Sequence, residues 1–155
     1  MADMMKAAHA AVADLQGVED DELYRLLAVR LKAIERDPST AGNFAPTVRA
    51  AELGVAPGDL LKFGKATFVK IGEAGHGVVC GSDADQGFHL QRLLSSFNTD
   101  VNTVTAAVTG LLIAQLAIAP AIAGVVATLV VGKLAPTSVD ALCKVWGAKV
   151  AAARH

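Results

Sequence analysis

Apolar side chains recur every three to four positions along most of this chain, which is the period of an α-helix. The clearest example is residues 21–36, where Asp20 or Asp21 stands at the expected N-cap position. Its apolar face consists of Leu23, Leu27, Leu31 and Ile34. The other positions of this segment are mostly polar, so the pattern predicts an amphipathic helix that covers a core with one side.

Other segments repeat this pattern, and none alternates with the period of a β-strand. The expected helices are residues 3–16, a short one at 46–53, one from Pro57 through Val78, one from about 85 to 97, and a last one at 137–153. The sequence therefore predicts an all-α fold. We expect a single domain over residues 1–155, in which six to eight helices form a compact bundle.

Residues 101–134 differ from the rest because they have almost no polar side. No charged side chain occurs from Val101 to Gly132. Projected on a helix, each half of this stretch has small residues on one side and bulky aliphatic residues on the other. Pro120 interrupts it, and proline inside a helix kinks or breaks the helix. We expect a central pair of apolar helices that meet near Pro120 at a kink or a buried corner.

The small residues of this pair suggest close helix contacts. Gly110, Ala114, Gly124 and Thr128 fall on its small-residue sides, and residues spaced in this way let helix backbones approach one another. Trp146, on the last helix, is expected to anchor a core or an interface. A leucine in place of Gly124 should then disrupt the packing by overfilling the contact.

Three interpretations of the uncharged stretch stay open. It forms the buried centre of a helical bundle or oligomer, or one kinked membrane span, or a hairpin that is hidden in one state and inserted into a membrane in another. A span requires roughly 20 apolar residues, and residues 104–132 are long enough if Pro120 only kinks them. Basic residues that follow would hold the C-terminus in the cytoplasm: Lys133, Lys144, Lys149 and Arg154.

Composition narrows the class of function. Hydrophobic residues make up 53% of the chain, charged residues 19%, and the mean hydropathy is +0.43. This balance is typical of a membrane protein or of a heavily buried assembly, because soluble domains average about 25% charged residues. Residues 1–37 carry five basic and eight acidic groups, whereas residues 101–155 carry four and one. No basic stripe with interspersed aromatic residues is present, so nucleic-acid binding is not expected.

Candidate chemistry is sparse. Cys80 has His76 four residues before it, so on a helix the imidazole could lower the pKa of the thiol. Their small, apolar surroundings favour a packed cysteine instead. His76, Cys80, His89 and Cys143 lack the paired spacing of a zinc site, and no metal or cofactor is expected. The glycines of "GHGVVCG" and the acidic run "DADQG" do not match a dinucleotide or a calcium loop.

The two cysteines and the N-terminal residues suggest a cellular context. The first residues lack the long apolar core of a signal peptide, and a secreted disulfide scaffold carries more cysteines. We expect a cytoplasmic protein with both thiols free, or alternatively a membrane protein. The predicted function is non-enzymatic: a helical interaction or assembly protein that self-associates, or binds a protein partner, through residues 101–134. A membrane-acting protein that inserts residues 104–132 is the alternative, and an enzyme based on Cys80 is a weaker one.

Overall fold

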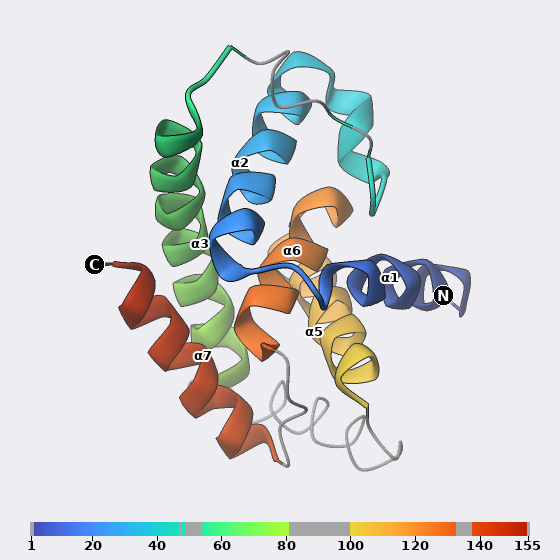
Figure 1. Cartoon of the computed structure of the whole chain (residues 1–155). Helices are drawn as coiled ribbons and strands as arrows, with labels where there is room; N and C mark the ends of the chain where they lie inside the picture. Colours follow the sequence, from blue (N-terminus) through green and yellow to red (C-terminus); the bar gives the residue numbers. More distant parts are fainter. Residues whose placement is uncertain (1, 47, 49–53, 81–99, 133–137, 155) are drawn as a thin grey trace.

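Helices make up all the regular structure that the computed structural model describes, and the all-α prediction is confirmed. The structure describes residues 2–46, 48, 54–80, 100–132 and 138–154. In these residues the elements are α1 (Ala2–Leu15), α2 (Asp20–Arg36), the 3-10 helix η1 (Pro38–Gly42), α3 (Pro57–Cys80), α5 (Val101–Leu116), α6 (Pro120–Val131) and α7 (Val139–Ala153). Their arrangement in space is shown in Figure 1.

Helix α6 lies at the centre of the bundle. Every residue from Ala121 to Val131 is buried. This helix contacts α1, α2, η1, α3, α5 and α7, so it is enclosed on all sides. A helix without a polar face avoids water only in such surroundings. Its one polar side chain, Thr128, donates its hydroxyl hydrogen to the carbonyl oxygen of Gly124 at 2.8 Å, which satisfies the hydroxyl inside the helix.

Helices α5 and α6 form a hairpin rather than a kinked rod. The side chain of Asp100 caps the start of α5 by accepting a hydrogen bond from the Thr103 amide. The helix ends at Leu116, and its C-cap residue Ala117 adopts the left-handed conformation with a φ of 53°. Pro120 then opens α6 at the first position, where its missing N–H costs nothing. The break near Pro120 is therefore confirmed, but the expected buried corner is wrong, because Ala117 is exposed and Ile118 is only half-buried.

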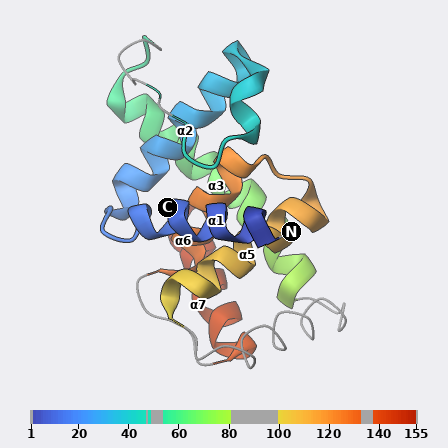
Figure 2. The ribbon, with the colours of Figure 1, turned by 90° about the vertical axis from the view of Figure 1, so that its right-hand side faces the viewer.

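Helix α1 covers one side of this hairpin. Figure 2 shows α1 running across α5 and α6, and contacts between α1 and both helices agree with this view. Ala8 and Val12 of α1 are buried against Ala106 of α5. The apolar side predicted for the first helix therefore faces the hairpin.

Helices α2 and α3 cross in close contact beside Gly64. A Cβ atom built on Gly64 would overlap the carbonyl oxygen of Tyr24, so only glycine fits at this crossing. The rings of Tyr24 and Phe68 meet edge to face beside it, with their centroids 5.5 Å apart. The crossing holds the apolar side of α2 against α3 and α6.

Helix α7 packs against the C-terminal half of α3, as Figure 1 shows. Two further glycines make room for it. A Cβ on Gly72 would lie 2.8 Å from Val150 Cγ2, and one on Gly75 would lie 2.6 Å from Trp146 Cζ2. At Gly124, where we expected a close contact, a Cβ would meet only Val12 Cγ1 at 3.8 Å. The tightest helix approaches therefore lie on α3 and not on α6.

A disulfide bond joins Cys80, the last residue of α3, to Cys143 in the first turns of α7, with their Cα atoms 5.8 Å apart. The prediction of two free thiols is therefore wrong. The chain sequence gave no sign of the pairing, because the two cysteines are 63 residues apart and only the packing of α7 on α3 brings them together.

The predicted boundaries of α1, α2, α3 and α7 agree with the structure to within a few residues, whereas the start of the helix predicted at 46–53 is wrong. The N-cap of α2 is Glu19, so Asp20 and Asp21 lie in its first turn, where negative charge is favoured by the helix dipole. Pro46 and Val48 are not helical, and the remainder of the helix predicted at 46–53 is outside the described residues. The helix predicted at 85–97 also lies outside them.

We predict that two glycine-to-alanine substitutions differ clearly in their effect on stability. Gly64→Ala should lower the free energy of unfolding by about 2–3 kcal/mol, because its Cβ forces α2 away from α3. Gly124→Ala, the matched control in α6, should be neutral or stabilise by up to about 1 kcal/mol through helix propensity. Denaturant unfolding followed by circular dichroism measures both. Equal stability of the two variants would contradict the assigned crossing.

We also predict that the disulfide stabilises the fold. The double variant Cys80→Ser/Cys143→Ser should lose about 2–4 kcal/mol of unfolding free energy, as expected when a cross-link that closes a long loop is removed. Adding a thiol reductant should lower the melting temperature of the natural chain and leave that of the double variant unchanged. A reductant effect of equal size on both proteins would argue against the bond.

Candidate functional site

The residues proposed for helix contacts fall into two groups in the structure. Gly110 and Ala114 lie on α5, where Gly110 is half-buried and Ala114 is exposed. Gly124 and Thr128 lie in α6 inside the core, and Trp146 is fully buried on α7. Only the first two are therefore accessible to a second molecule in this conformation.

Gly110 and Ala114 belong to an uncharged surface, residues 110–119, which we name the hairpin tip. Leu112 is buried in the core, but most other side chains of the tip are only partly covered. Ala114, Gln115 and Ala117 are exposed, and Leu111, Ile113, Leu116 and Ile118 are half-buried. Gly110 and Ala114 lie four residues apart on α5, so these two small residues share one face of the helix. Its composition makes it an apolar surface that water solvates poorly.

Trp146 is a structural anchor in the α3–α7 contact. Its indole N–H donates to the carbonyl oxygen of Gly72 at 2.9 Å, and its ring lies in the space left by Gly75. His76 meets the indole edge to face, with a centroid distance of 6.2 Å. The buried indole therefore has its polar atom satisfied, as buried tryptophans require.

The proposed pair of His76 and Cys80 has no free thiol, because the sulfur of Cys80 is bonded to Cys143. A small cleft of about 230 Å³ lies beside His76, between α3 and α7. An ion pair between Glu73 and Arg154 spans it. No serine, threonine or cysteine lines this cleft, so its described side chains offer acid–base groups without a nucleophile.

The described residues hold neither a metal-binding cluster nor a membrane-spanning helix. The described parts of the chain contain no group of three or more His, Cys, Asp or Glu side chains that could hold a metal ion, and His89 lies outside them. Within those parts, each helix is too short or too polar to cross a bilayer by itself.

Arg30, which the sequence analysis did not single out, is buried in the middle of α2. Its guanidinium donates to the carbonyl oxygens of Phe44 and Ala121, both at 3.0 Å, and thereby joins α2 to the loop after η1 and to the start of α6. No carboxylate pairs with it among the described residues. Burial lowers the pKa of Arg30 to about 10. Through these contacts Arg30 holds α2 and the loop after η1 against the start of α6.

Tyr24 is the only tyrosine in the chain and is buried at the crossing of α2 and α3. Burial, together with the nearby charges of Asp20 and Asp21, raises its pKa to about 12. The folded state therefore keeps the phenolic proton at a pH where the unfolded chain loses it. Because the unfolded chain ionises first, the free energy of unfolding falls as the pH rises from 10 toward 12.

We predict that the tyrosinate absorbance of the folded protein titrates about two pH units above that of the chain in denaturant. Tyr24→Phe should remove the signal and should weaken the loss of stability between pH 10 and 12. The comparison isolates Tyr24, since Arg30 titrates in both proteins. A midpoint near pH 10 in the folded chain would contradict the burial of this phenol.

Comparisons with protein-family models, with curated proteins and with solved structures find no match to this chain.

Proposed function

We propose that this protein is a non-enzymatic helical assembly protein that self-associates through the hairpin tip. The observation that carries the proposal is the uneven burial of the uncharged stretch. Helix α6 is wholly enclosed, whereas the second half of α5 and the turn after it are partly open to solvent. A second copy would bury Leu111, Ile113 and Leu116, which the fold leaves half-buried.

The shape of the tip supports contact between helices. Gly110 and Ala114 are spaced by four residues, so a partner helix can approach the backbone of α5 closely there. Because the tip has no charge, a symmetric contact between two copies places no like charges opposite each other. The proposal keeps Gly110 and Ala114 as interaction residues and assigns Gly124, Thr128 and Trp146 to internal packing.

Membrane insertion of residues 104–132 is the alternative, and the absence of charge throughout the hairpin favours it. Its helices are short for that purpose. With 16 and 12 residues, α5 and α6 extend about 24 and 18 Å, whereas a bilayer core is about 30 Å thick. Insertion would also have to break the contacts of Arg30 with Ala121. Self-association needs no rearrangement, so it has the stronger support.

We predict that Ala114→Asp weakens self-association by about tenfold or more, because it places an unpaired charge in the contact. Ala152→Asp, at an exposed position of α7, is the matched control and should associate like the natural chain. Light scattering after size exclusion gives the mass, and each monomer is 15.9 kDa. Both variants should keep the melting temperature of the natural chain.

Two results would overturn the proposal. One is a natural chain that stays monomeric at the highest concentration tested. The other is an Ala114→Asp variant that assembles as well as the control. Monomers that release dye from anionic vesicles would favour the insertion alternative instead.

A further inference from the structure

A second surface, different in chemistry from the hairpin tip, lies on the N-terminal half of α3. Helix α3 has 24 residues and α7 has 15, so α3 is longer by about 14 Å. Since α7 packs on the C-terminal half of α3 and ends at Ala153, none of the described helices covers the other half on this side, as Figure 1 shows. The opposite side of α3 is occupied by α2.

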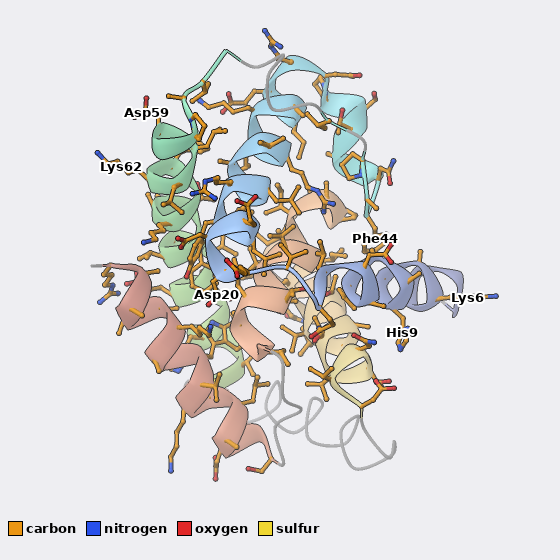
Figure 3. All side chains as sticks on the ribbon, in the orientation of Figure 1. Lys6, His9, Asp20, Phe44, Asp59 and Lys62 are labelled. Atoms are coloured by element: carbon orange, nitrogen blue, oxygen red, sulfur yellow. A yellow bond between two sulfur atoms is a disulfide. The ribbon has the colours of Figure 1, made fainter. Side chains whose placement is uncertain are left out.

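A groove of about 750 Å³ occupies this uncovered position. Its floor is apolar and includes Leu61, Ala66 and Val69 of α3. Its cationic side chains are Lys62, Lys65 and Arg154, and none of the described residues that line it carries a carboxylate. Figure 3 shows Lys62 pointing outward from this half of α3, with Asp59 one turn away at its end.

The positive charges of the groove are only partly compensated. Arg154 pairs with Glu73. The ammonium of Lys65 lies 5.8 Å from the centre of the Tyr24 ring, and Lys62 has no ion pair among the described residues. A ligand that brings carboxylates beside an apolar stripe would therefore match both the charge and the floor of the groove.

We propose that this groove binds an acidic amphipathic helix of a partner protein. The helix would lie beyond the end of α7 and continue its line along α3. Leucine-type side chains would cover Leu61 and Val69, while flanking glutamate or aspartate side chains would reach Lys62 and Lys65. The exposed length from Gly58 to Val69 is about three turns, which is enough for such a contact.

The test uses two synthetic peptides of about 18 residues, a length that lets an isolated helix form. Both carry leucines at every third or fourth position, one with glutamates on the flanks and the other with lysines. Fluorescence anisotropy of labelled peptide with the full, oxidised chain should show the acidic peptide binding about tenfold or more tightly than the basic one. Raising the salt concentration should weaken this binding, because exposed charges are screened.

Charge variants locate the contact. Lys62→Glu/Lys65→Glu should abolish the preference or reverse it in favour of the basic peptide, and Lys62→Gln/Lys65→Gln should give an intermediate affinity. The matched control is Lys70→Glu/Lys144→Glu, which changes the net charge equally at exposed positions outside the groove and should bind like the natural chain. Melting temperatures verify that all variants are folded.

Three results would overturn the inference. The first is equal affinity for both peptides or for neither. The second is natural affinity in the Lys62→Glu/Lys65→Glu variant or an equal loss in the control. The third is a change of oligomer mass in the Lys62→Glu/Lys65→Glu variant, which would identify a second copy of this chain as the occupant. The peptide affinities do not depend on the hairpin tip, so the proposed self-association, which Ala114→Asp tests, can fail or hold independently of them.

Discussion

A helix that has no polar face must be enclosed by other parts of the chain, and this constraint on α6 organises the rest of the molecule. Ala121 through Val131 are all buried, and every other described helix contributes to covering them. The amphipathic helices α1, α2, α3 and α7 therefore all turn their apolar faces inward, toward α6. Burial of apolar surface is the main favourable term in folding, so the most hydrophobic helix takes the position that is most completely buried.

Enclosing one helix with several others requires close approaches between the covering helices, and α3 provides them. Gly64 admits the backbone of α2, while Gly72 and Gly75 admit Val150 and Trp146 of α7. Polar and covalent links then fix the arrangement. The Trp146 indole and the Cys80–Cys143 bond hold α7 to α3, and Arg30 holds α2 to the start of α6. The ion pair of Lys149 with Asp20, at 2.6 Å, adds a link between α7 and α2.

Although α6 is enclosed, two other surfaces of the described residues remain partly uncovered, and their chemistry differs. The hairpin tip is uncharged and consists of small and aliphatic side chains, whereas the groove on α3 combines an apolar floor with lysine and arginine side chains. A charged partner gains nothing at the tip but gains Coulombic attraction at the groove. The two proposals therefore involve different partners and different dependence on salt.

Local rules were sufficient for α1, α2, α3, α5, α6 and α7, though not for the start of the helix expected at 46–53. The all-α class, the central apolar pair, the break at Pro120 and the inward faces with Leu23, Leu27 and Trp146 follow from periodicity and from proline geometry, which depend only on neighbouring residues. The apolar side of α3 already contained Gly64 and Gly75, so the signal for a close contact was present, although nothing indicated which helix would use it.

Tertiary structure alone decided the pairings between distant residues. It joined Cys80 to Cys143 and brought Gly64 against the backbone of Tyr24. It also brought Arg30 within hydrogen-bond distance of the carbonyl oxygens of Phe44 and Ala121. It also decided that Gly124 and Thr128 are internal while Gly110 and Ala114 remain accessible. The physical reason is that an apolar helix face indicates that it will be buried, but it does not indicate which segment of the chain will cover it. Which segment covers it depends on how all the helices share a single core. Patterns of neighbouring residues do not reveal which distant segments come together there.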